Sequence, residues 1–244
     1  MSADPDEPEV VATARYAGRV GLSLVVVLGA AVPYLLLYLL VSQGWQPLVD
    51  LDIAIEAEAH RAVLDSSVLR KAAFLATFLG GGGVRTALTL AVCALLVATR
   101  RPRLGVFLLV TVSGGALLNV LLKALANRAR PLFPDALSVE SSTSFPSGHT
   151  MGTTVFVAGL LVLAWPSLPH RSRALVTLLA ALAVSAVAAS RVLLGVHYLS
   201  DVVAAVLAGI VWVTVSTVAF LGGRADRGRR PGVRTPVVAG GAVG

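Results

Sequence analysis

Long apolar segments without charge are the feature that most constrains what this chain can form. Residues 20–41 hold 22 consecutive uncharged residues, enough to cross about 30 Å of hydrocarbon as a helix. Similar segments recur along the chain, and we expect spans at about 20–41, 82–99, 104–122, 149–166, 173–190 and 198–223. The sequence therefore predicts an all-α fold, a polytopic membrane bundle of six transmembrane helices.

Composition supports a membrane protein and argues against other classes. Apolar residues make up 56% of the 244 residues and charged residues only 14%, against about 25% in soluble domains. The net charge of +7 does not indicate nucleic acid as a partner, because the basic residues lie at the ends of apolar segments. We expect one bundle domain over residues 17–223, with disordered tails at 1–16 and 224–244. The lipid bilayer is its expected partner, and no oligomeric state is predicted.

Charge bias predicts the orientation of the bundle. Six spans place both termini on one side, and twelve of the twenty Lys and Arg residues fall on that side. These are Arg15, Arg19, Arg100, Arg101, Arg103, Arg171, Arg173, Arg224, Arg227, Arg229, Arg230 and Arg234. Short cytoplasmic loops carry the excess of basic residues, so we expect both termini in the cytoplasm. The compactness of the chain favours a bacterial inner membrane as its location.

Two regions are less clearly defined by the pattern. The second span has only 14 uncharged residues from Thr86, and it is long enough only if it starts near Gly82 with Arg85 reaching toward the interface. Residues 50–71 place apolar side chains every four residues, from Leu51 to Val63, which favours an amphipathic helix on the outer surface. Alternating apolar residues at the start of the same segment leave a strand open.

The remaining polar residues gather in three clusters at span ends. They lie at residues 123–131 after the third span, at 145–149 before the fourth, and at 190–201 between the fifth and sixth. Because two spans separate the second cluster from the third, all three must emerge on the same face of the membrane. The charge bias places that face on the extracytoplasmic side.

The first cluster carries three cations within eight residues, Lys123, Arg128 and Arg130. Basic residues at a helix end often only reach toward the lipid headgroups. Here they lie on the face that charge bias should leave poor in cations. We therefore favour capture of a phosphate group, for which Arg offers paired donors and Lys a point charge.

The other two clusters each contain a histidine whose neighbours favour a role in catalysis. A Pro-Ser-Gly turn precedes His149, so Ser147 can cap the following helix while backbone N–H groups face an anion. His197 and Asp201 are four residues apart and share one helix face, which lets the carboxylate fix the imidazole tautomer. Structural histidines and a self-neutralising His–Asp pair are the alternatives.

In order, the motifs read Lys-x6-Arg-Pro over 123–131, Pro-Ser-Gly-His over 146–149 and Ser-Arg-x5-His-x3-Asp over 190–201. They resemble the signature of the type 2 phosphatidic acid phosphatase superfamily, which covers the chain from the third span to the sixth. The signature residues are all present. Leu199 stands where many relatives have proline and Ala205 where glycine is frequent, which concerns substrate choice rather than chemistry.

This resemblance implies a role for each matching residue. His197 would be the nucleophile and form a phosphohistidine, Asp201 would orient its ring, and His149 would protonate the leaving group. The residues implied to hold the phosphate oxygens are Lys123, Arg130, Ser147, Gly148 and Arg191. No cluster of carboxylates or of His and Cys has metal-ligand spacing, so we expect neither a metal nor a cofactor.

The implied function is hydrolysis of the terminal phosphate of a lipid phosphomonoester or pyrophosphate, at the extracytoplasmic face. Phosphatidic acid, phosphatidylglycerol phosphate and undecaprenyl pyrophosphate all fit, and the sequence does not choose among them. One alternative is a phosphotransferase that uses an acceptor other than water. Another is a non-catalytic transporter or binding protein for lipid phosphates.

Overall fold

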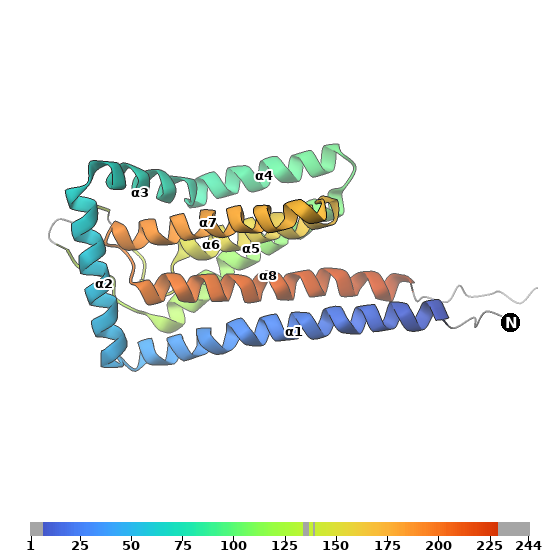
Figure 1. The fold of residues 1–244 in the computed structure, drawn as a ribbon, viewed down its shortest axis with the longest axis horizontal. Helices are drawn as coiled ribbons and strands as arrows, with labels where there is room; N and C mark the ends of the chain where they lie inside the picture. The colour runs from blue at the N-terminus through green and yellow to red at the C-terminus, as the bar shows by residue number, and fades with distance from the viewer. Residues whose placement is uncertain (1–6, 134–136, 139, 229–244) are drawn as a thin grey trace, which may run out of the picture.

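The computed structural model describes residues 7–133, 137–138 and 140–228, and all regular elements within these ranges are helical. Figure 1 shows the long helices running side by side, while α2 crosses one end of the bundle. The helices are α1 (Glu7–Ser42), α2 (Gln46–Asp65), α3 (Ser67–Leu79), α4 (Gly82–Ala98), α5 (Pro102–Ala126), α6 (Gly148–Ala164), the 3₁₀ turn η1 (Trp165–Ser167), α7 (His170–Leu193) and α8 (Leu199–Gly228). The predicted all-α bundle is confirmed.

Within the described residues, five helices are long and apolar enough to cross a membrane by length and composition. They cover Gly21–Ser42, Pro102–Ala126, Gly148–Ser167, His170–Leu193 and Leu199–Phe220. Helices α3 and α4 pass the same test only as a pair, with a bend of 47° between them. The six-span prediction thus holds if this broken pair is one span, so the second span differs from the continuous helix expected at 82–99.

The break in the second span has a local cause. Four consecutive glycines, residues 80–83, join α3 to α4, and glycine is a poor helix former. Gly80 also lies so close to α7 that a Cβ there would stand 2.5 Å from a methyl carbon of Val187. Arg85 turns back and donates to the carbonyl of Gly80 at 3.0 Å, so it binds at the break between α3 and α4.

The terminal helices extend further than expected. Helix α1 begins at Glu7, so most of the predicted tail at 1–16 is helical, and α8 continues to Gly228. Pro8 falls in the first turn of α1, where a missing N–H costs nothing, and no glycine interrupts the helix before Gly18. Residues 1–6 and 229–244 lie outside the described residues.

Helix α2 is the amphipathic helix expected near residue 50, but it is turned the other way. Its buried face carries Asp52, Glu56 and His60 together with Val63, whereas Leu51 is half exposed. The spacing of the apolar residues predicted the reverse. The polar face is buried because α2 lies across the end of the bundle where cations gather, as described below.

Close packing among α5, α6 and α8 fixes the ends of these helices. The Trp212 ring of α8 lies against two glycines of α5, and a Cβ at Gly114 would come within 2.4 Å of it. The Trp212 indole N–H donates to the carbonyl of Thr111 at 2.7 Å. Met151 and Val155 of α6 complete this core. The three helices are therefore held in a fixed register, so the relative positions of their ends beneath α2 are fixed as well.

Candidate active site

The three polar clusters meet at the end of the bundle that α2 covers (Figure 1). The guanidinium of Arg130, from the first cluster, lies 3.1 Å from Nε2 of His197 in the third. The backbone N–H of Ser147, from the second cluster, donates to the carbonyl of Asp201 at 3.1 Å. The prediction that topology brings these segments to one face therefore agrees with the observed contacts.

The geometry around His197 defines its tautomer. Its Nδ1 lies 3.3 Å from Oδ2 of Asp201, while its Nε2 faces Nη1 of Arg130. A guanidinium only donates hydrogen bonds, so Nε2 must be the unprotonated nitrogen and Nδ1 carries the proton toward the carboxylate. The imidazole lone pair therefore points into the group of cations.

His197 is 1% exposed, and its surroundings favour the neutral ring. Burial lowers the pKa of His197 to about 4, although the hydrogen bond and the charge of Asp201 act in the opposite direction. Near neutral pH the ring is thus uncharged and has its Nε2 lone pair available.

Two of the predicted phosphate-binding cations are held by backbone carbonyls of the 142–144 segment. Arg130 donates to the carbonyl of Ser142 at 2.6 Å and also to the carbonyl of Val196 at 2.7 Å. Lys123 donates to the carbonyl of Thr143. These partners are neutral, so they hold both side chains in place beside His197 without offsetting a positive charge.

The third predicted cation, Arg191, is 2% exposed and comes from the last turn of α7. Its guanidinium donates to the hydroxyl of Thr77 on α3 and pairs with the carboxylate of Glu140. Its Nε–H is buried and has no hydrogen-bond partner among the described residues. The Nε–H of Arg191 is thus available to donate to a further acceptor.

The Pro-Ser-Gly-His motif forms the first turn of α6. The Ser147 hydroxyl is fully buried and accepts from the N–H of Thr150, so it acts as the helix cap expected from the sequence. Gly148 leaves little room for a side chain, because a Cβ there would lie 3.0 Å from Oδ1 of Asn119. His149 interacts electrostatically with Arg191, Glu140 and His197 across the site.

Three site residues escaped the sequence prediction. The Ser144 hydroxyl donates to Asp201, Glu140 pairs with Arg191, and Asp52 of α2 accepts hydrogen bonds from Arg128 at 2.8 Å and from the N–H of Ser200 at 3.0 Å. The residues at 140 and 144 lie in an irregular loop without a pattern. The polar residues of α2 did carry a signal, since Asp52, Glu56 and His60 recur every four residues and so share one helix face.

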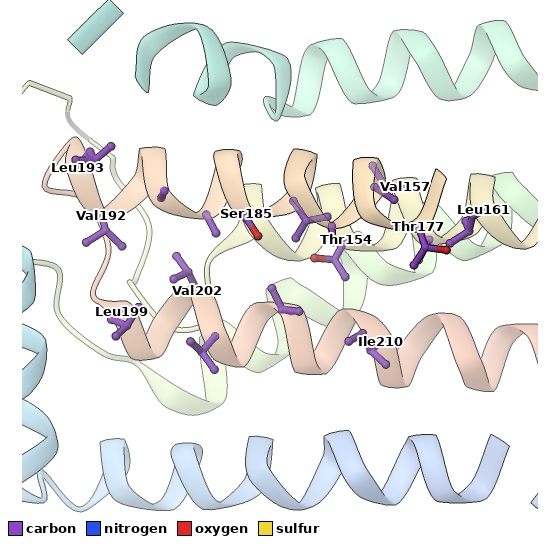
Figure 2. A pocket seen from close by; sticks show the side chains of 18 of the residues that line it. Thr154, Val157, Leu161, Thr177, Ser185, Val192, Leu193, Leu199, Val202 and Ile210 are labelled. Carbon is purple, nitrogen blue, oxygen red and sulfur yellow. The ribbon is translucent and has the colours of Figure 1, made fainter. Parts of the chain in front are cut away.

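An apolar groove of about 760 Å³ adjoins the site, between α6, α7 and α8. Figure 2 shows side chains from these helices lining the space, with Val192 and Leu199 at one end. Those two residues neighbour Arg191 and Ser200 in the chain, so the groove leads from the polar site along the apolar length of the bundle. Small side chains of α7, among them Ala181 and Ala188, give it depth.

The fold and the site together define the class of the molecule, an integral membrane helical bundle with a cationic, histidine-containing site at one end. The sequence model described as the PAP2 superfamily matches residues 103–222, which include every residue of the three motifs. This match confirms the resemblance of the three motifs to the PAP2 superfamily.

Two relatives support this assignment. Phosphatidylglycerophosphatase B of Bacillus subtilis is 38% identical over 101 residues, which are 40% of this chain and 49% of that protein. The match thus spans about half the length of this curated relative. The crystal structure of a transmembrane PAP2-type phosphatidylglycerolphosphate phosphatase, also from Bacillus subtilis, superimposes with a TM-score of 0.69 at 26% identity. It covers 82% of this chain and 97% of that one.

Proposed function

We propose that the protein is a membrane phosphatase that removes the terminal phosphate from a lipid, through a phosphohistidine on His197. The observation that carries this proposal is the orientation of the His197 ring. Its Nε2 lone pair faces Arg130, and its Nδ1–H faces Asp201. A neutral nucleophile beside fixed cations is what attack on a phosphate group requires.

In the first step, Nε2 of His197 forms a bond to phosphorus while the bond from phosphorus to the leaving oxygen breaks. His149 gives its proton to that oxygen. The His197 ring becomes positively charged, and Asp201 stabilises it through the Nδ1–H. The groups proposed to hold the nonbridging oxygens are Lys123, Arg130, Arg191, the Gly148 N–H and Ser147. Ser147 contributes mainly by fixing the helix turn, because its hydroxyl is already bound within α6.

In the second step, water attacks the phosphohistidine. The oxygen of the water bonds to phosphorus as the bond to Nε2 breaks, and its proton passes to His149. Inorganic phosphate leaves, and both histidines return to their starting protonation states. The three cations balance the charge of the phosphate, so these steps need no metal. Among the described residues no group of His, Cys, Asp and Glu is arranged to hold a metal ion.

A lipid is the substrate class that suits the surroundings of the site. The apolar groove provides a path for a hydrocarbon chain whose phosphate lies among the cations. The names of the two relatives point to phosphatidylglycerol phosphate as the first lipid to test. Phosphatidic acid and undecaprenyl pyrophosphate are the comparison substrates.

The test is phosphate release by purified protein from these three lipids in the presence of EDTA. We expect release from at least one lipid and its loss in His197→Ala. His170→Ala is the matched control, because His170 is exposed at the start of α7, at the other end of that helix from Arg191. If folded protein releases no phosphate from any lipid, the hydrolase proposal fails. A phosphorylated acceptor would then indicate a transferase, and binding without turnover a lipid-binding protein.

A further inference from the structure

Asp52 is an acidic residue of α2 that is 1% exposed, far from the motifs in sequence, and bound on two sides. Its Oδ2 accepts from the Arg128 guanidinium at 2.8 Å and its Oδ1 accepts from the N–H of Ser200 at 3.0 Å. The Ser200 hydroxyl donates to it as well. A carboxylate buried this deeply is costly unless it is paired, so these contacts have to be kept.

Arg128 connects Asp52 to the catalytic pair. One nitrogen of its guanidinium bonds Asp52, and the other bonds Oδ1 of Asp201 at 2.7 Å. The Tyr198 ring lies against the guanidinium, 4.2 Å from its centre. Burial acts to lower the pKa of Arg128, but the two carboxylates outweigh it and raise this pKa above its ordinary value. Arg128 thus remains charged between them.

The result is a row of four linked side chains, in which basic and acidic groups alternate: His197, Asp201, Arg128 and Asp52. Each oxygen of Asp201 is occupied: Oδ1 by Arg128, and Oδ2 by Ser144, by the Tyr198 N–H and by His197. Without Arg128, Asp201 would lose the partner that fixes the rotation of its carboxylate. Without Asp52, Arg128 would lose the partner that holds it in place.

We propose that Asp52 and Arg128 are positioning residues for the phosphatase reaction, and that α2 is therefore part of the active site. This inference rests on the proposed function. The row holds Asp201 where it stabilises the positive charge that His197 acquires as phosphorus is attacked. Asp52 offsets the charge of Arg128, which would otherwise oppose that change. Both residues act on the transition state more than on the bound substrate.

Steady-state kinetics of Asp52→Asn test this role. We expect kcat to fall by about 10- to 100-fold, the size usual for groups that orient a reacting residue, with KM changed less than about twofold. Arg128→Lys keeps the charge but cannot bridge two carboxylates with paired donors. We therefore expect the same fall in kcat with a similarly small change in KM. Glu58→Gln is the matched control on α2, because Glu58 pairs with Arg61 at the exposed surface. It should behave as wild type.

Anion binding, measured by calorimetry, separates positioning from a merely structural role. Vanadate adopts the five-coordinate geometry of the transition state, whereas inorganic phosphate resembles the bound product. Asp52→Asn should weaken vanadate binding about tenfold or more and leave phosphate binding within about twofold. Equal weakening of both anions, or of neither, in a variant with cooperative thermal unfolding would overturn the proposal.

The same measurements keep the two proposals apart. Wild-type protein that binds vanadate but releases no phosphate would refute the phosphatase function. The ratio of vanadate to phosphate affinity in Asp52→Asn would still test the positioning role of Asp52. If Asp52→Asn does not fold, Arg128→Lys carries the test with the same two expectations. An Arg128→Lys variant with wild-type kcat and wild-type vanadate affinity would then contradict the inference.

Discussion

His197 and His149 need opposite protonation states at the start of the proposed reaction. His197 must be neutral to attack, and His149 must be protonated to donate. Burial lowers the pKa of His197 to about 4, which keeps it neutral over most of the range in which an ordinary histidine would be charged. Asp201 supports that arrangement by holding the Nδ1 proton.

The pH dependence of kcat/KM follows from the requirement that His197 is neutral. We expect an acid limb near pH 4, because protonation of His197 removes the nucleophile only below its lowered pKa. The measurement is kcat/KM on a lipid phosphate between about pH 3 and 9. An acid limb near pH 6.5, the ordinary histidine value, would argue against this view of His197.

Glu140 forms an ion pair with Arg191, one of the cations proposed to bind the substrate phosphate. Its carboxylate pairs with Arg191, and although partial burial acts to raise the pKa of Glu140, the Arg191 charge and hydrogen bond lower it below its ordinary value. A substrate phosphate must compete with this carboxylate. In Glu140→Gln the competition disappears, and a partly exposed ion pair is worth about 1 kcal/mol.

We therefore expect Glu140→Gln to lower KM by about fivefold, as measured by initial rates on lipid vesicles. The Glu58→Gln variant is the reference for loss of one acidic charge at the same face. A rise in KM together with a fall in kcat would instead mean that Glu140 holds Arg191 in its working position.

At the scale of the elements, the apolar groove links the site to the hydrocarbon region. Ala181 lines it on α7, ten residues before Arg191 and thus about 15 Å from it along the helix. Ala181→Phe should fill part of the groove and raise KM for a long-chain diacyl substrate about tenfold. Rates on a short-chain, water-soluble phosphate should not change, since its tail does not reach Ala181.

The control for this prediction is Leu182→Phe. Leu182 neighbours Ala181 on α7 and is exposed, but it does not line the groove. An equal change of KM for both chain lengths in Ala181→Phe would mean that the groove does not hold the substrate chain.

The elements also show which parts of the molecule the sequence determines by itself. The starts of α6 and α8, which carry two of the motifs to the site, were predictable from the bounds of the apolar segments and from the number of spans between them. The glycines at 80–83 do favour a break between α3 and α4, but the close approach of Gly80 to Val187 on α7 could not be predicted from the sequence. The orientation of α2 depends likewise on Arg128 and Ser200, partners that only the folded chain brings near Asp52.

At the scale of the whole molecule, the start of α1 and the end of α8 lie at one end of the bundle and the polar site lies at the other (Figure 1). Charge bias predicts that the site faces away from the cytoplasm. Cysteine labelling tests this in a chain whose single natural cysteine, Cys93, is replaced by alanine. Ser141→Cys, in the α5–α6 loop, should react with a membrane-impermeant maleimide on intact cells.

Ser167→Cys is the matched position at the opposite end, in the exposed turn between α6 and α7. It should react only after the membrane is opened. The reverse pattern would place the site in the cytoplasm and overturn the predicted orientation, while leaving the fold and the site geometry unchanged.

The gathering of all three motifs at one end of the bundle also makes the molecule sensitive to lipid asymmetry. A site that opens at a single face reaches the headgroups of one leaflet only. In sealed liposomes that contain protein in one orientation, phosphate release should stop once the lipid of that leaflet is consumed. Addition of a lipid scramblase should then restart it. Supply of substrate across the bilayer would in that case set the rate at which this protein works in a cell.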